Sequence, residues 1–250
     1  MAERLSGEPN LSFAAADVFC YSFIMDQEIL SLFQNAQRLG IELNEQQLTQ
    51  FNVYKNELLQ WNTKTNLISE KSAQEIVSRH FLDSLTALHF IDNPTARIID
   101  IGSGAGFPGI PLKIARPNLQ LYLMESNRKK VSFLKHIIRL LNFTETFVLH
   151  ERAENLIKNN KWKDFFDVVI SRATFKLPEF LSLSAFFLAP QGTLIALKGR
   201  DIDSEFSACV KSATASCFSE LFQHDVNSPL RDTPHKIIVG KKIKKDKKSF

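Results

Sequence analysis

The chain has 250 residues, of which 44% are hydrophobic, enough for the core of one large domain or two small ones. Its apolar runs are far shorter than the ~20 residues that cross a bilayer, and its first residues lack the pattern of a secretory signal, so we expect a cytoplasmic protein without membrane contact. Three cysteines, without CxxC spacing or a histidine cluster, indicate a reduced protein with no structural metal.

The net charge of +4 is located at the carboxyl terminus, because residues 241–250 hold six lysines and a single acid. Without them the chain is close to neutral. A lysine-rich tail of this kind either adds nonspecific affinity for phosphate backbones or is a solvated terminus, and the sequence leaves both interpretations open. We treat 241–250 as a segment of its own.

The amino-terminal part of the chain is predicted to be helical. Residues 1–24 show no sustained period, whereas an apolar helical pattern begins after Met25, so we expect Met25 to be the working start and 1–24 to be a disordered leader or a start-site artefact. Asn44 is placed to cap a second helix, and Ser72 and Glu75 have the spacing of a capping box at the start of a third. Pro94 ends this helical section, 25–94, in which no strand is predicted.

From residue 95 to residue 240 short apolar strands alternate with helical stretches such as Lys129–Leu141. This alternation predicts an α/β fold, with a mainly parallel seven-stranded sheet covered by helices on both faces. Only a loop separates the last two strands, so we expect them to form an antiparallel hairpin at the end of the sheet. The predicted strands are Arg97–Ile101, Gln120–Glu125, Thr146–Glu151, Asp167–Ser171, Thr193–Leu197, Glu220–Asp225 and Lys236–Val239.

A glycine-rich loop follows the first strand, in Asp100-Ile-Gly-Ser-Gly-Ala-Gly-Phe-Pro-Gly109. It lacks the GxGxxG spacing of dinucleotide enzymes, because the third glycine position holds Phe107, and this argues against a nucleotide-dependent oxidoreductase. Gly102 and Gly104 permit close backbone approach to a ligand, and Glu125 ends the second strand, where it suits ribose hydroxyls. Each feature alone has a structural explanation, a tight turn or a helix-entry acid. Together they predict S-adenosylmethionine as cofactor and a class I, Rossmann-like methyltransferase.

Further motifs make the resemblance more specific. They are Asn66-Leu-Ile68, Arg79-His-Phe-Leu-Asp-Ser84, Arg128-Lys-Lys-Val-Ser-Phe-Leu134, Arg152-Ala-Glu154, Ser171-Arg-Ala173 and Ala196-Leu-Lys-Gly199. With the glycine loop they resemble the glucose-inhibited division protein B family, from about residue 44 to 242. The resemblance implies an enzyme that methylates guanine N7 at one site in the decoding region of bacterial 16S ribosomal RNA. The implied partner is that RNA or the small ribosomal subunit, and we expect a monomer.

The resemblance also implies roles for individual residues. Contacts to the cofactor are expected from Gly102, Phe107, Ala153, Glu154 and Arg172, in addition to Gly104 and Glu125. Arg172 and Lys198, each at the end of a strand, are expected to position the acceptor, and RNA contacts are expected from Arg79, His80 and Lys198. Each has a plainer alternative: core packing for Phe107, a helix-terminal acid for Glu154, a surface position for Lys198, and a structural pairing with Asp83 for His80.

No general base is required, because guanine N7 attacks with its own lone pair and carries no proton in the neutral base. Neighbouring chemistries fit less well. The chain has Ser171-Arg-Ala-Thr174 where enzymes that alkylate exocyclic amines carry Asn/Asp-Pro-Pro-Tyr/Phe, and its cysteines are not placed for attack on cytosine. Two alternatives stay open: a methyltransferase of small molecules, and an RNA-binding or ribosome-assembly protein that keeps the fold without the activity.

Overall fold

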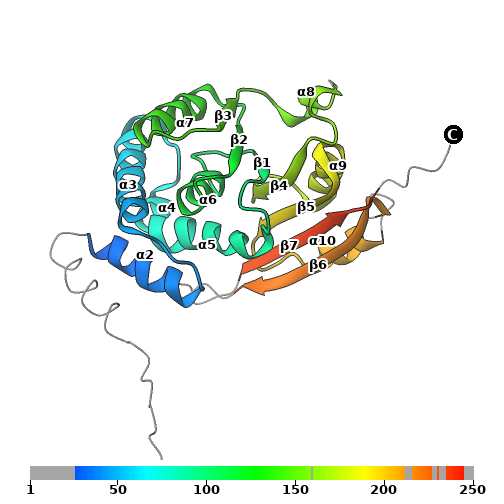
Figure 1. Ribbon diagram of the computed structural model, residues 1–250, viewed down its shortest axis with the longest axis horizontal. Helices are drawn as coiled ribbons and strands as arrows, with labels where there is room; N and C mark the ends of the chain where they lie inside the picture. Colours follow the sequence, from blue (N-terminus) through cyan, green and yellow to red (C-terminus); the bar gives the residue numbers. More distant parts are fainter. Residues whose placement is uncertain (1–25, 159, 212–215, 227–229, 231–234, 245–250) are drawn as a thin grey trace, which may run out of the picture.

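The structure is a computed structural model that describes residues 26–158, 160–211, 216–226, 230 and 235–244. Its centre is a seven-stranded sheet of order β3-β2-β1-β4-β5-β7-β6 (Figure 1). The strands are β1 (Arg97–Ile101), β2 (Gln120–Met124), β3 (Thr146–Leu149), β4 (Phe166–Arg172), β5 (Leu188–Lys198), β6 (Phe218–Val226) and β7 (His235–Lys242). The predicted α/β fold is confirmed, while the predicted leader 1–24 lies outside the described residues.

The first five strands pair in parallel, and the strand order reverses between β1 and β4. β7 runs antiparallel to both β5 and β6, which confirms the predicted hairpin. In a parallel sheet the point of reversal leaves a crevice outside the carboxyl ends of the strands. The loops that follow β1 and β4 therefore meet where a ligand is expected.

Alternate side chains of the strands point into two separate cores, as the pleat of a strand requires. Ile98 of β1 belongs to a core shared with α2 (Gln27–Arg38), α3 (Glu45–Thr65), α6 (Gly109–Ala115) and α7 (Arg128–Leu140). Its neighbour Ile99 faces a second core, with α9 (Leu177–Phe187) and α10 (Asp203–Val210). The amino-terminal helices thus bury their apolar faces in the same core as the sheet, and the boundary at residue 94 stays a prediction.

The segment between α3 and β1 differs from the single amphipathic helix that the sequence predicts. It is divided into α4 (Glu70–Gln74), a π-helix η1 (Ile76–Phe81), α5 (Leu82–Leu85) and a 3₁₀ helix η2 (Thr86–Phe90). The predicted capping box is wrong, because Ser69 is the N-cap and accepts the N–H of Ser72 at 3.2 Å. π-Helical turns are rare and occur mostly at functional sites, which directs attention to Arg79 and His80 within η1.

Two strands also extend beyond the predicted ranges. β5 begins at Leu188, five residues before the predicted start, and contains Gln191 with φ of +66° before Gly192. β7 continues to Lys242, which falls within the predicted lysine-rich tail, 241–250. The Lys242 side chain is buried, and its ammonium donates to Asp164 Oδ1 at 2.6 Å. At least this lysine therefore has a structural role.

Tyr54 of α3 connects the amino-terminal helices to the glycine loop. Its ring is fully buried, and its hydroxyl donates to the carbonyl oxygen of Ala105 at 2.8 Å. Tyr54→Phe should lower the free energy of unfolding by about 1–3 kcal/mol, because it leaves that buried carbonyl without its donor. Urea denaturation measures the change. Tyr122→Phe is the matched control, since the structure describes no hydrogen bond to that hydroxyl, and an equal loss in both variants would contradict the expectation.

Candidate active site

The glycine loop after β1 depends on its glycines for its conformation. Gly102, Gly104 and Gly106 have φ of +74°, +59° and +107°, a region that residues with side chains rarely adopt. The N–H of Gly102 and that of Ser103 both donate to the carbonyl of Met124, at 2.9 and 3.0 Å, which holds the loop against the end of β2. A Cβ on Gly102 would lie 2.5 Å from Thr174 Cγ2. Both the backbone conformation and the available space therefore require glycine at residue 102.

Glu125 directly follows β2 and closes one side of this loop. Its carboxylate accepts the N–H of Gly104 at 2.9 Å and the N–H of Asn127 at 2.7 Å, one bond to each oxygen. A carboxylate oxygen has two lone pairs, so each oxygen keeps capacity for a further donor such as a hydroxyl. The backbone bonds fix the direction in which that capacity points.

These residues line a first pocket, of about 320 Å³, at the carboxyl edge of the sheet. Its lining residues are Ile101, Gly102, Met124, Glu125, Ser126, Lys130, Glu151, Arg152, Ala153, Glu154, Thr174 and Phe175. Four predicted cofactor contacts, Gly102, Glu125, Ala153 and Glu154, are thus brought together. Lys130 and Thr174 also line the pocket and were not among the predicted site residues, although Lys130 lies within a motif of the resemblance.

A second pocket, of about 260 Å³, lies next to the first. Its lining residues are Arg79, His80, Asp83, Arg172, Ala173, Leu197, Lys198, Gly199 and His235. Thr174 belongs to the first pocket and Arg172 to the second, and between them Ala173 has φ of +55°. The chain therefore turns sharply at the end of β4, and successive residues serve the two pockets. All the predicted RNA contacts line the second.

Arg172 is partly buried and is held by groups of η1 and of the glycine loop. Its guanidinium donates to the carbonyl of Arg79 at 3.1 Å and to Nδ1 of His80, and lies 4.9 Å above the ring of Phe107. The imidazole of His80 stacks on that same ring, with centroids 4.6 Å apart. Burial lowers the pKa of Arg172 from its ordinary value, while the negative charge of Asp83 raises it.

Three predicted cofactor contacts, Gly104, Phe107 and Arg172, do not line the first pocket, although Gly104 bonds to Glu125, which does. Phe107 is buried beneath Arg172 and His80 and does not line the first pocket, so the plainer alternative, core packing, describes its position. Arg172 lines the second pocket. Sequence reasoning also missed Asp83 and His235 as pocket residues. They are about 150 residues apart in the chain, and no sequence pattern indicates that two such distant residues come together.

The two remaining predicted RNA contacts are cations at the rim of the second pocket. The Lys198 ammonium donates to the carbonyl of Phe175, and burial lowers its pKa from the ordinary value. The Arg79 side chain forms an ion pair with Glu75 at 2.7 Å and is partly exposed. Among the described residues there is no group of three or more histidine, cysteine or acidic side chains suited to a metal ion.

Asp100, at the end of β1, carries a fully buried carboxyl group. One oxygen accepts the N–H of Gly109 at 2.9 Å, and the other, Oδ1, has no hydrogen-bond partner among the described residues. Burial raises the pKa of Asp100 from 3.8 to about 7, chiefly because the charged form is desolvated. A buried acceptor of this kind, beside a glycine loop, suits a cationic or hydrogen-donating ligand.

The raised pKa of Asp100 predicts how the stability of the ligand-free protein depends on pH. From about pH 4 to pH 7 the folded protein keeps a proton on Asp100 that the unfolded chain has lost. The contribution of this proton to the free energy of unfolding is therefore full below pH 4 and is lost as the pH rises to about 7. Within this range the free energy of unfolding should change by about −1.4 kcal/mol per pH unit because of Asp100. Urea denaturation at several pH values should show that Asp100→Asn removes this component and that Asp92→Asn, at an exposed position, leaves it.

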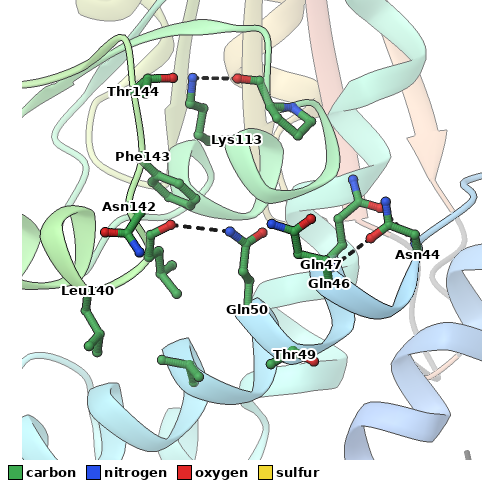
Figure 2. Close-up of a pocket in the computed structure, with 13 residues that line it drawn as sticks. Asn44, Gln46, Gln47, Thr49, Gln50, Lys113, Leu140, Asn142, Phe143 and Thr144 are labelled. Atoms are coloured by element: carbon green, nitrogen blue, oxygen red, sulfur yellow. Dashed lines mark hydrogen bonds between the residues drawn. The ribbon is translucent and has the colours of Figure 1, made fainter.

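A larger pocket, of about 500 Å³, lies at the opposite edge of the sheet, where α3 begins and α6 and α7 end. Figure 2 shows that many of its lining side chains are amides, and that several of these amides form hydrogen bonds with neighbouring residues. Gln47 donates to the carbonyls of Ile114 and Ala115 at 2.9 and 3.0 Å, and Lys113 donates to that of Pro117 at 2.7 Å. These groups satisfy the end of α6. The pocket is therefore a structural junction, remote from the carboxyl edge.

Comparison with known proteins finds relatives over most of the chain. The family model described as rRNA small subunit methyltransferase G matches residues 47–233. A ribosomal RNA small subunit methyltransferase G of Syntrophus aciditrophicus is 47% identical over 176 residues, covering 70% of this chain and 73% of that protein. One of Caldanaerobacter subterraneus is 38% identical over 219 residues, covering 87% and 91%.

Solved structures resemble the chain more distantly. A predicted O-methyltransferase of Agrobacterium tumefaciens aligns with a TM-score of 0.52 and 21% identity, over 65% of this chain and 79% of that one. The fibrillarin/Nop5p complex aligns with a TM-score of 0.50 and 14% identity, over 65% and 82%. At such identities the likeness shows the fold alone, and it agrees with the seven-stranded sheet of order β3-β2-β1-β4-β5-β7-β6.

Proposed function

The chain belongs to the family of rRNA small subunit methyltransferase G and is an S-adenosylmethionine-dependent enzyme that methylates guanine N7 in 16S ribosomal RNA; from this premise we propose how its two pockets divide the reaction. The first pocket holds the cofactor, and the second receives one guanine of the decoding region. The observation that carries this proposal is the sharp turn at Ala173, which places Thr174 at one pocket and Arg172 at the other.

The residues of the first pocket fit S-adenosylmethionine chemically. Asp100 does not line the pocket, but it directly precedes the lining residues Ile101 and Gly102, and its buried Oδ1, which has no hydrogen-bond partner among the described residues, suits an ammonium group. The loop glycines leave the backbone open to close approach. The Glu125 oxygens keep lone pairs for ribose hydroxyls, and Ala153 and Glu154, which line the same pocket, would contact the adenine. When bound, the cofactor supplies a methyl group on a positively charged sulfur.

The second pocket positions the acceptor. Guanine N7 carries no proton, so its residues have only to align that nitrogen with the methyl group, at ~3–3.5 Å, and to exclude water. Arg172 and Lys198 present donors to O6 of the base or to a phosphate, and Arg79 lies at the rim, where the RNA backbone would pass. His80 holds Arg172 in place through Nδ1 and the shared stack on Phe107.

We extend the proposal to the surroundings of the enzyme. We propose that it acts as a monomer on the small ribosomal subunit or its RNA, in the cytoplasm. Within the described part of the chain, every helix is too short or too polar to cross a membrane. The tail from residue 245 onward lies outside the described residues.

Two measurements test this function. Calorimetric titration should detect S-adenosylmethionine binding, with Glu125→Ala weakening it at least about tenfold, because hydrogen bonds to a charged group are worth ~1.5–3 kcal/mol each. Incubation of the protein and labelled cofactor with naked 16S RNA, and separately with small subunits that lack the modification, should label one guanine at N7. Cofactor binding without labelling of either substrate would favour the small-molecule alternative, and absence of both would favour an assembly protein.

A further inference from the structure

Asp83 is a buried acid that the proposed reaction does not use. It lies on α5, lines the second pocket, and has only 5% of its surface exposed. Its carboxylate is 3.7 Å from Nδ1 of His235, whose own exposure is 3%, and the other imidazole nitrogen lies 3.4 Å from the Thr86 hydroxyl. Thr86 in turn donates to the carbonyl of Asp83 at 2.6 Å. The first residue of β7 is thus fixed against α5 at the wall of the pocket.

A carboxylate has several lone pairs, so Asp83, which has partners within the fold, keeps capacity to accept further donors at the pocket wall. Asp83 and Arg172 line the same pocket, and the negative charge of Asp83 favours the charged form of Arg172 and raises its pKa. The pocket therefore presents hydrogen-bond donors, from Arg172 and Lys198, together with one acceptor, Asp83. Three basic side chains, with Arg79 at the rim, and one carboxylate form a mixed set, which differs from the uniformly positive surface that binds phosphate.

This set matches the edges of guanine. A guanine whose N7 faces the methyl donor turns O6, an acceptor, to the same side and carries two donors, N1–H and the N2 amino group, on its Watson–Crick edge. A carboxylate accepts both of those donors in parallel, whereas adenine has an acceptor at N1 and would meet the carboxylate unfavourably. The donors and the acceptor of the second pocket are therefore those that O6 and the N1/N2 edge require.

We infer that Asp83, held by His235, reads the Watson–Crick edge of the acceptor guanine and sets the specificity of the enzyme for that base. This inference rests on the proposed function of the second pocket. Asp83 contacts the base itself, while His235 is a positioning residue that acts through Asp83. The consequence is a preference for guanine over bases that lack the N2 amino group or the N1 proton.

Mononucleotides test the inference, because guanosine, inosine and adenosine 5′-monophosphates share their sugar and phosphate. Inosine monophosphate lacks only the N2 amino group. As inhibitors of small-subunit methylation by the unmodified enzyme, the three should rank in that order, with guanosine monophosphate at least about fivefold tighter than inosine monophosphate. Asp83→Asn should bring the two inhibition constants within twofold of one another, while the dissociation constant of S-adenosylmethionine in the first pocket stays unchanged.

The comparison within one protein separates recognition from folding. Global destabilisation of Asp83→Asn would weaken all three nucleotides together, whereas loss of recognition removes only the difference between them. Should Asp83→Asn fail to fold, His235→Gln is the second variant: the guanosine preference should fall while inosine monophosphate binding stays within twofold. Equal binding of guanosine and inosine monophosphates by the unmodified enzyme would overturn the inference. If no nucleotide competes while the cofactor still binds, the assignment of the second pocket as the acceptor site is itself wrong.

Discussion

Arg172→Ala should lower kcat/KM for methylation of the small subunit by at least about 100-fold and leave the dissociation constant of S-adenosylmethionine within about threefold. The guanidinium lines the second pocket, between the Phe107 ring and the carbonyl of Arg79, and its removal frees the base to shift. A misplacement of about 1 Å is enough for a loss of that size. Single-turnover transfer of a labelled methyl group measures the first quantity, and calorimetry the second.

Arg97→Ala is the matched control. Arg97 also lies over a phenylalanine, 4.7 Å from the Phe165 ring, and pairs with Asp167 at 2.8 Å, but it stands at the amino end of β1, away from both pockets. That variant should lose stability and keep its transfer rate. Arg172→Lys keeps the charge without the planar fork, so it should recover only part of the activity. An Arg172→Ala enzyme that transfers normally, or one that loses only cofactor binding, would refute the role assigned to this residue.

Gly102→Ala is expected to weaken cofactor binding and to raise the dissociation constant of S-adenosylmethionine at least about tenfold. The added methyl group would lie 2.5 Å from Thr174 Cγ2, at a residue whose φ is +74°. The backbone conformation alone costs about 1–2 kcal/mol for a residue with a side chain, and the overlap must also move Thr174, which lines the cofactor pocket.

Gly40→Ala separates the cost of the backbone conformation from the cost of the overlap with a neighbouring side chain. Gly40 has φ of +70° and nothing within 4 Å of an added Cβ, and it follows α2 at a distance from the pocket. It should therefore show the backbone cost in a denaturation experiment and normal cofactor binding. If Gly102→Ala bound the cofactor as tightly as Gly40→Ala does, the close packing of the glycine loop on Thr174 would have no part in binding.

The sequence predicted the sheet well because its signals are local. Most strands contain a short apolar run, with the largely polar β6 as the exception, and the glycine loop and Glu125 are close enough in the chain to be recognised together. The structure confirms the seven strands and places Gly102, Glu125, Ala153 and Glu154 around one pocket. Their chemical roles stay predictions.

The second pocket was less accessible to sequence reasoning, for physical reasons. Periodicity predicted one regular helix before β1, but η1 inserts a π-turn there, which depends on packing that a hydrophobic pattern does not encode. The spacing of His80 and Asp83 suggested a pairing within that helix. In the structure His80 bonds Arg172, and Asp83 approaches His235 on β7. Such partners arise from the order of the strands, where β7 returns beside β5.

The position of β7 beside β5 also sets the order in which the residues of the two pockets are synthesised. The cofactor pocket draws on residues 101–175 alone, whereas the second pocket combines residues of η1 with His235, near the carboxyl terminus. During synthesis the methyl donor's site is complete in sequence about sixty residues before the acceptor's site. A growing chain therefore contains every lining residue of the proposed methyl-donor site before it contains His235, the residue that we infer to position the reader of the base.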